Sequence, residues 1–231
     1  MAILTAHQPL YLPWAGLFHK IAQADAFVFF DSVQFEYHEF GNRNRIMTGQ
    51  GPLMLTVPVE RKGHLEKPIC EIGIADPRFA TKHVRTLRMA YGKAPYFALY
   101  MDELEEILCR GHRLIADLNI ELTVWLMQKL GCVRPWQRAS KMGIAGKGSD
   151  LVLDMCVKAG ASTYIFGAHG RDYADVDVFR AEGIEPRFQM FTPPVYRQVH
   201  RRGFVPGLSV IDLLFNRGPD SLAIIKAQNP A

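Results

Sequence analysis

Residues 2–21 read Ala-Ile-Leu-Thr-Ala-His-Gln-Pro-Leu-Tyr-Leu-Pro-Trp-Ala-Gly-Leu-Phe-His-Lys-Ile, and an apolar run at 26–30 follows, ending in Asp31. This order predicts a strand, a polar loop, a short helix that starts at Pro13, and a second strand. In a parallel βαβ unit, the carboxyl ends of both strands lie at the same edge of the sheet, where ligands of open α/β sheets bind. His7 ends the first predicted strand and Asp31 ends the second, so we expect them to converge on one crevice.

The rest of the chain extends this pattern over a single domain, residues 1–231. A length of 231 residues with 48% hydrophobic content supports one substantial core. A helical segment at about 80–131 is expected between two βα-containing halves. Further strands are predicted at 53–59, 69–74, 163–166 and 186–191, and further helices at 80–90, 100–110, 114–130, 149–159, 173–182 and 209–216. The expected fold class is α/β, with an open, mostly parallel sheet flanked by helices in Rossmann-like layers.

Composition excludes several classes of protein. No apolar stretch approaches the roughly 18 residues that cross a bilayer, and a signal-peptide pattern is absent, so we expect a cytoplasmic protein. The four cysteines lack Cys-x-x-Cys spacing, which argues against a zinc or redox motif and predicts buried free thiols; they are Cys70, Cys109, Cys132 and Cys156. A net charge of +4 is too small to establish nucleic-acid binding by itself.

The loop after the first strand holds the most unusual polar cluster. His7 can bind a ligand or relay a proton, because imidazole titrates near neutral pH. Gln8, Tyr11 and Trp14 accompany it, and two nearby prolines stiffen the loop. The alternative is a histidine that only bonds neighbouring backbone.

A second group of candidates lies at and after Asp31, in the aromatic-rich insertion at 32–51. The Asp31 carboxylate could orient His7, act as a base, hold a metal or bind a ribose hydroxyl. Gln34, Asn42 and Arg43 offer amides and a planar cation that suit a carboxylate, a phosphate or sugar hydroxyls. A turn with a surface arginine is the competing interpretation.

The loop after the strand at 163–166 reads Gly167-Ala-His-Gly170 and leads to Tyr173. Glycines there let the backbone approach a ligand, and His169 would border the same sheet edge as His7. The spacing matches neither a dinucleotide fingerprint nor a P-loop. A tight turn without a ligand is equally compatible with the pattern.

Polar and aromatic residues near the C-terminus suit a wall against a sugar or nucleotide, because aromatic faces pack on rings and amides pair with hydroxyls. These substrate-binding candidates are Gln189, Tyr196, Gln198 and His200. Basic residues cluster in three places, which favours an anionic ligand or a solvated basic surface; they are Arg43 with Arg45, Arg61 with Lys62, and Arg197 with Arg201 and Arg202.

The opening motif His7-Gln-Pro-x-Tyr-x-Pro-Trp-x-Gly16 resembles the WbqC-like family. The likeness continues over nearly the whole chain, in the segments 20–35, 42–46, 164–173, 194–198 and 204–218. The resemblance implies a role in making bacterial surface polysaccharide, especially O-antigen, and the transfer of glycine or another aminoacyl or acyl group onto a sugar.

We therefore expect a transferase acting on an amino sugar, as a nucleotide sugar or lipid-linked sugar. His7 would deprotonate the acceptor and Asp31 would orient His7. No cofactor is expected, and the donor is open; an aminoacyl-tRNA would give the basic clusters a purpose. Two alternatives stand beside this hypothesis. One is a metal-dependent hydrolase using His7 and Asp31, and the other is a non-catalytic glycan- or nucleotide-binding partner protein.

Overall fold

The N-terminal βαβ unit is present in the computed structural model, which describes residues 2–37, 39–61, 63, 66–200 and 203–227. Strands β1 (Ala2–His7) and β2 (Ala26–Phe29) pair in parallel, with α1 (Ala15–Ala22) between them. His7 lies opposite Phe29 at the carboxyl end of the pair. The two strands thus end at one edge of the sheet, as the sequence predicts.

Three further strands complete a five-stranded parallel sheet in the order β5-β2-β1-β6-β7. They are β5 (Trp136–Arg138), β6 (Ala161–Phe166) and β7 (Glu185–Phe188). Counted along the chain, the strands of this sheet follow the order 3-2-1-4-5, which is that of a doubly wound α/β fold. The strand order reverses between β1 and β6, and this reversal is the topological switch point. The predicted fold class is confirmed.

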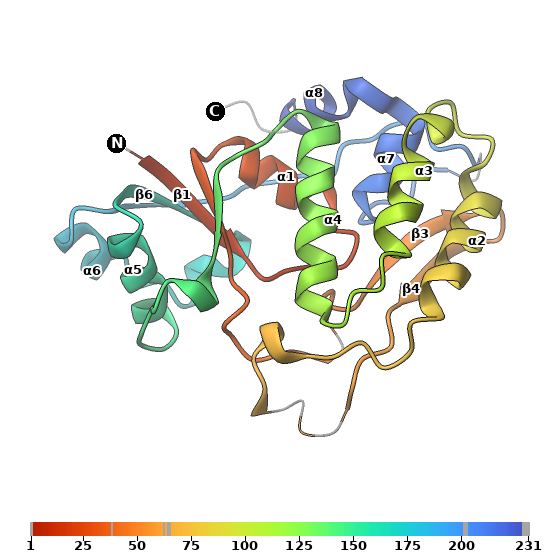
Figure 1. Cartoon of the computed structure of the whole chain (residues 1–231). Coiled ribbons are helices and arrows are strands. Elements are labelled where there is room, and N and C mark those ends of the chain that lie inside the picture. The colour runs from red at the N-terminus through yellow and green to blue at the C-terminus, as the bar shows by residue number, and fades with distance from the viewer. Residues whose placement is uncertain (1, 38, 62, 64–65, 201–202, 228–231) are drawn as a thin grey trace.

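Both faces of the sheet are buried, as parallel sheets require. Along β2, Phe27 and Phe29 belong to one hydrophobic cluster and Val28 belongs to the other. Helices α5 (Ser149–Lys158) and α6 (Val176–Ala181) lie on the Val28 face, and α1 lies on the opposite face (Figure 1).

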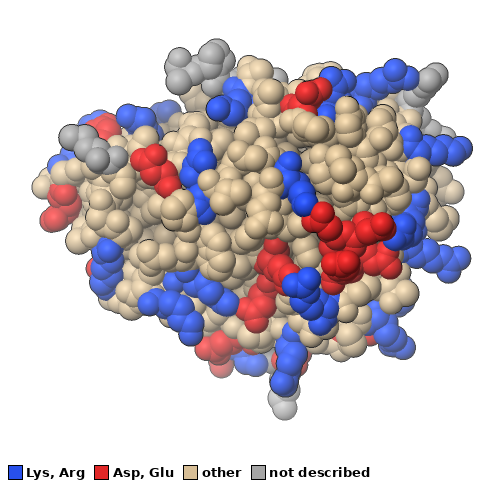
Figure 2. Space-filling view, turned by 45° about the horizontal axis from the view of Figure 1, so that its top comes forward, with Lys and Arg blue, Asp and Glu red and all other residues tan. Residues whose placement is uncertain are grey.

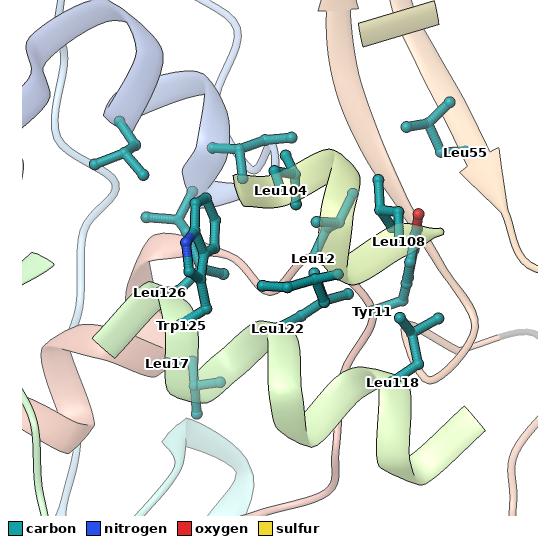
Figure 3. Close-up of a cluster of buried hydrophobic side chains, with 14 of the residues drawn as sticks. Tyr11, Leu12, Leu17, Leu55, Leu104, Leu108, Leu118, Leu122, Trp125 and Leu126 are labelled. Atoms are coloured by element: carbon teal, nitrogen blue, oxygen red, sulfur yellow. The ribbon is translucent and has the colours of Figure 1, made fainter. Parts of the chain in front are cut away.

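The larger cluster extends beyond the sheet into a helical region. It contains α2 (Phe79–Tyr91), α3 (Phe97–Leu108), α4 (Ile115–Leu130), α7 (Val210–Arg217) and α8 (Ser221–Lys226). Leu118, Leu122 and Leu126 of α4 follow the predicted four-residue spacing and pack toward α3 and the loop after β1 (Figure 3). Gly131 ends α4 in the left-handed conformation with φ 76°, which glycine adopts without strain.

A separate antiparallel hairpin packs against α2. Strands β3 (Arg43–Thr48) and β4 (Gly51–Thr56) pair with each other and with no strand of the main sheet in the described chain. The strand predicted at 53–59 is therefore displaced toward the N-terminus, and its partner lies in the insertion, where no strand was predicted. Short 3-10 helices occupy several loops of the described chain; they include η2 (Ile69–Glu71), η3 (Ala139–Lys141), η4 (Ala168–Asp172) and η5 (Gly218–Asp220).

Two strand predictions need correction. The strand predicted at 69–74 is wrong over its first half, because η2 turns the chain and Ile69 N donates to Val33 O in a loop. Strand β5 lies in the stretch 132–148, where the composition indicated a loop. Its three residues are too few for a recognisable pattern, yet they pair with β2 at the edge of the sheet.

Several helix starts also differ from the expectation; α3, for example, begins at Phe97, three residues earlier than predicted. Pro13 lies outside α1, because its carbonyl accepts a hydrogen bond from Val210 N and Trp14 takes the N-cap position. Ser149 is the first helical residue of α5 and accepts from Asp175 N instead of capping its own helix. Asp175 in turn caps α6, so this helix starts three residues later than predicted.

The thiols are all free, and burial is as expected for Cys132 and Cys156. Cys109 is exposed because it follows the last turn of α3 at the C-cap, and Cys70 is half-buried. Among the described residues, no helix has the length and apolar character needed to cross a membrane.

Candidate functional site

A cavity of about 420 Å³ opens at the switch point, beside the carboxyl ends of β1 and β6. We call it the switch-point pocket. Its lining includes these predicted site residues: His7, Gln8, Trp14, Gly167, His169, Gly170, Tyr173 and Gln189. The fold therefore brings together residues that are up to 182 positions apart, at the place where doubly wound sheets bind ligands.

His7 lies at the end of β1 with its ring nitrogen Nδ1 3.0 Å from Gln8 O. A carbonyl oxygen only accepts, so Nδ1 carries the proton and Nε2 keeps a free lone pair. Burial, and then the charge of Lys20, lower the pKa of His7 to about 3. The imidazole is therefore neutral at physiological pH and suited to accept a hydrogen bond.

Lys20 is a charged pocket residue that was not among the site residues predicted from the sequence. It lies on α1, is 3% exposed, and its Nζ donates to Ala6 O at 2.8 Å. Burial lowers the pKa of Lys20 to about 7. A signal was present in the sequence, because Lys20 stands three residues after Leu17 and next to Ile21 on the apolar face of the helix.

Trp14 forms one wall of the pocket where the loop enters α1. Its indole lies over Gly16, where a Cβ would be 2.2 Å from the ring, so only glycine fits. The ring also meets Phe191 edge-on, with centroids 5.4 Å apart. These contacts hold an aromatic face beside the pocket, as ring-shaped ligands require.

Gln189 joins the end of β7 to α1. Its Nε2 donates to Gly16 O at 2.7 Å and lies 3.1 Å from Nδ1 of His19. Burial lowers the pKa of His19, which favours the neutral ring that can accept this bond. Gln189 therefore fixes the helix start that carries Trp14 and Gly16.

The loop after β6 forms the outer rim. Gly170 packs against Phe166, whose Cβ would lie 2.4 Å from a Cβ at this position, so the close turn needs glycine. His169 is almost fully exposed, with Nδ1 3.5 Å from Asp172. Tyr173 is half-exposed and meets Phe166 edge-on. The rim thus presents polar groups to solvent beside a buried aromatic base.

Asp31 does not reach the switch-point pocket. It is 0% exposed, and its Oδ2 accepts from Arg138 Nε at 2.7 Å and from Ser140 Oγ at 2.8 Å. Its Oδ1 accepts from Ser140 N at 2.9 Å. The carboxylate therefore holds the β5 segment against the end of β2, and the group that orients His7 is the Gln8 carbonyl.

Three other candidates lie around the hairpin and α2, and a fourth, Gln34, lies in the loop after β2. Tyr11 is buried, and its hydroxyl lies 2.8 Å from His83 Nδ1. Asn42 is buried and donates to Val57 O at 2.8 Å. Arg43 is half-buried at the start of β3, and Gln34 is exposed opposite Pro68. None of these four lines the switch-point pocket.

Two of the C-terminal candidates, Tyr196 and Gln198, belong to a buried network around Asp212. Its carboxylate accepts from the hydroxyls of Tyr91 and Tyr196 at 2.8 and 2.7 Å, and from Gln198 Nε2 at 3.1 Å. Burial raises the pKa of Asp212 despite these bonds. His200 lies with Nε2 2.7 Å from Ala90 O. Arg201, Arg202 and Lys62 of the basic clusters fall outside the described residues.

The metal-dependent alternative gains no support from the described part of the chain. Within it, no three side chains of His, Cys, Asp or Glu gather closely enough to hold an ion. His7 and Asp31, the ligands that this alternative names, have the separate partners described above.

The fold and pocket together define a doubly wound α/β protein with a ligand-sized cavity at its switch point. Residues 8–224 match the WbqC-like protein family, and the chain belongs to this family. It is 33% identical over 217 residues to a Mycobacterium tuberculosis protein described as "Uncharacterized protein Rv1507c", a match that covers 93% of each chain. No solved structure matches this chain.

Proposed function

We propose that the protein is a cytoplasmic transferase whose active site is the switch-point pocket. The acceptor would be an amino sugar, as a nucleotide sugar or lipid-linked sugar, and an acyl or aminoacyl group would be transferred to it. The observation that carries the proposal is a buried amine, Lys20, beside a neutral imidazole, His7, in a pocket with an aromatic wall. The sugar class comes from the resemblance to proteins of surface-polysaccharide synthesis.

Lys20 is the group that we assign to proton transfer. Its pKa of about 7 leaves much of the side chain as a neutral amine at physiological pH. One N–H donates to Ala6 O, so the lone pair can accept a proton from the acceptor. His7 is the weaker base, because its pKa is about 3, and its Nε2 would accept a hydrogen bond from a sugar hydroxyl.

In the proposed step, the acceptor nitrogen or oxygen bonds to the donor carbonyl carbon and passes its proton to Lys20 Nζ. The bond from that carbon to the leaving group then breaks, and the leaving group takes the proton. Gly16 brings the first turn of α1 to the pocket, and N–H groups of a first helical turn lack acceptors within the helix. The Gly16 N–H would stabilise the negatively charged oxygen that develops on the donor carbonyl during transfer.

The donor stays open within this proposal. An aminoacyl-tRNA would need a broad basic surface, and Figure 2 shows basic and acidic side chains interleaved over the face it presents. That face therefore offers no broad basic surface to a tRNA. Binding of a tRNA would be recognised by an affinity that falls steeply with salt.

The test is incubation of the full chain with a panel of nucleotide-linked amino sugars and acyl or aminoacyl donors, with mass spectrometry of the products. We expect a mass increase with the wild type and a loss of at least about 100-fold with Lys20→Met, the range for removing a proton-transfer group. Lys82→Met is the matched control, because Lys82 is an exposed lysine outside the pocket.

Two outcomes would contradict the proposal. Full turnover by Lys20→Met would remove the amine from the mechanism. Sugar-nucleotide binding without any product across the panel, undisturbed by His7→Ala, would support the non-catalytic binding protein instead.

A further inference from the structure

A second cavity, of about 610 Å³, lies between the α2–α3 loop, the segment 197–199 and the end of α7. It shares no lining residue with the switch-point pocket. We call it the basic pocket, after its lining side chains Lys93, Arg197 and Arg217; Tyr96, Val199 and Asp220 also line it.

The charges of the basic pocket are unbalanced. Three basic side chains face one acidic side chain, Asp220. Among the described residues, Lys93, Arg197 and Arg217 take part in no ion pair. By contrast, Arg78, Arg88, Arg110, Arg138 and Arg180 each pair with a carboxylate. A concave surface with an excess of positive charge attracts an anion.

The walls of the basic pocket are fixed by packing and hydrogen bonds. The Tyr96 ring lies against Gly218, where a Cβ would be 2.4 Å from the ring and where φ is 53°. Gln198 is 4% exposed, and its amide bonds to both Asp212 and Val205. Arg197 and Arg217 are the immediate neighbours of Gln198 and Gly218, so their backbones are anchored. Such support places charged groups before a ligand arrives.

We propose that the basic pocket binds the diphosphate group of a small molecule. The guanidinium groups of Arg197 and Arg217 would each offer a planar pair of donors, which matches phosphate oxygens, and Lys93 would add a point charge. The cavity has room for more than the phosphates, since ligand pockets span about 300–1,000 Å³. Tyr96 and Val199 would contact an apolar or ring-shaped part of the ligand. This site does not depend on the proposed transferase reaction.

Calorimetric titration of the full chain with inorganic pyrophosphate tests the proposal. We expect saturable binding to the wild type and a loss of about tenfold in affinity for Arg197→Ala and for Arg217→Ala, as for a lost charged hydrogen bond. Arg197→Lys should recover only part of it, because an ammonium lacks the planar fork.

The matched control is Arg85→Ala, which removes an exposed arginine of α2 outside the pocket. It should bind pyrophosphate like the wild type. Lys20→Met should also bind normally, which separates this site from the transferase mechanism. Should Arg217→Ala fail to fold, Lys93→Ala tests the same pocket through an exposed side chain.

A comparison of UDP with farnesyl diphosphate then distinguishes the source of the diphosphate. If either compound competes with pyrophosphate, the site is supported. Tighter binding of UDP indicates a nucleotide ligand, and tighter binding of farnesyl diphosphate indicates an isoprenoid ligand. Absence of pyrophosphate binding to the wild type, or equal weakening by Arg85→Ala, would overturn the proposal.

Discussion

Two buried charged residues, Asp31 and Lys20, lie near the ends of neighbouring strands but have opposite kinds of partner. After β2, Asp31 is fully buried, and both its oxygens have partners in Arg138 and Ser140. Beside the end of β1, Lys20 is almost as buried, but its partner is a neutral carbonyl, and no carboxylate of the described residues pairs with it. A buried charge with a complete set of partners holds the structure together, whereas one without a counter-charge beside a cavity is available for chemistry.

The largest loss of stability should come from breaking the ion pair between Asp31 and Arg138. Asp31→Ala leaves Arg138 without its buried partner and should reduce the free energy of unfolding by about 3–5 kcal/mol. Urea unfolding measures the loss. Asp117→Ala is the matched control, because Asp117 bonds the same guanidinium at 2.7 Å but its side chain is 42% exposed. Asp117→Ala should reduce the free energy of unfolding by about 1 kcal/mol or less. Equal losses for Asp31→Ala and Asp117→Ala would show that burial does not determine how much each ion pair stabilises the protein.

Removing the buried charge of Lys20 should have the opposite effect and raise the stability of the protein. Folding lowers the pKa of Lys20 from 10.5 to about 7, so between these pH values the unfolded chain binds more protons than the folded one. The contribution of Lys20 to the free energy of unfolding therefore rises with pH across that window. Below the window, Lys20 is charged in both states, and its burial destabilises the folded state by the full amount. Lys20→Met should raise stability at pH 6, by an amount on the order of a few kcal/mol.

Urea unfolding of wild type and Lys20→Met from pH 6 to pH 10 checks this sign. The advantage of the variant should shrink as pH increases. Lys82→Met, at an exposed lysine, should show no such trend. A constant difference between wild type and Lys20→Met would mean that Lys20 keeps its ordinary pKa.

The smallest effect on folding is expected at His7. Its ring is already neutral, so His7→Ala removes one bond to Gln8 O and should cost about 1 kcal/mol. Turnover should nevertheless fall about tenfold or more, because the ring lines the proposed site. Thermal unfolding and product formation, measured together, separate these roles. A variant that unfolds at ordinary temperature would show that His7 is structural.

Local pattern was sufficient to predict four of the five strands of the main sheet, β1, β2, β6 and β7. The periodicity of residues 2–30 and 161–188 carries enough information for parallel β-α units, since apolar runs and strand-end polar residues are adjacent in sequence. Strand β5 escaped prediction because it has three residues and is held by Asp31, more than 100 positions away. The same distance explains why Asp31 could be placed at the correct edge but not given its partner.

The pocket was predictable in part for a related reason. His7, Trp14 and the glycine loop follow directly from the ends of strands, where ligands gather. Lys20 was missed because an isolated lysine on a helix normally faces solvent, and only the packing of α1 on β1 buries it. The polar residues around Asp212 resemble a binding wall in sequence, but in three dimensions they satisfy one another.

The order of strands in the sheet also bears on how the protein is made. β1 is central and is synthesised before the other strands of its sheet, but its neighbour β6 begins at residue 161, and Thr5 bonds across to Ile165. Pairings between such distant segments form slowly, because a long loop of chain must close first. During synthesis, the backbone groups of β1 that face β6 therefore stay unpaired until β6 has been translated.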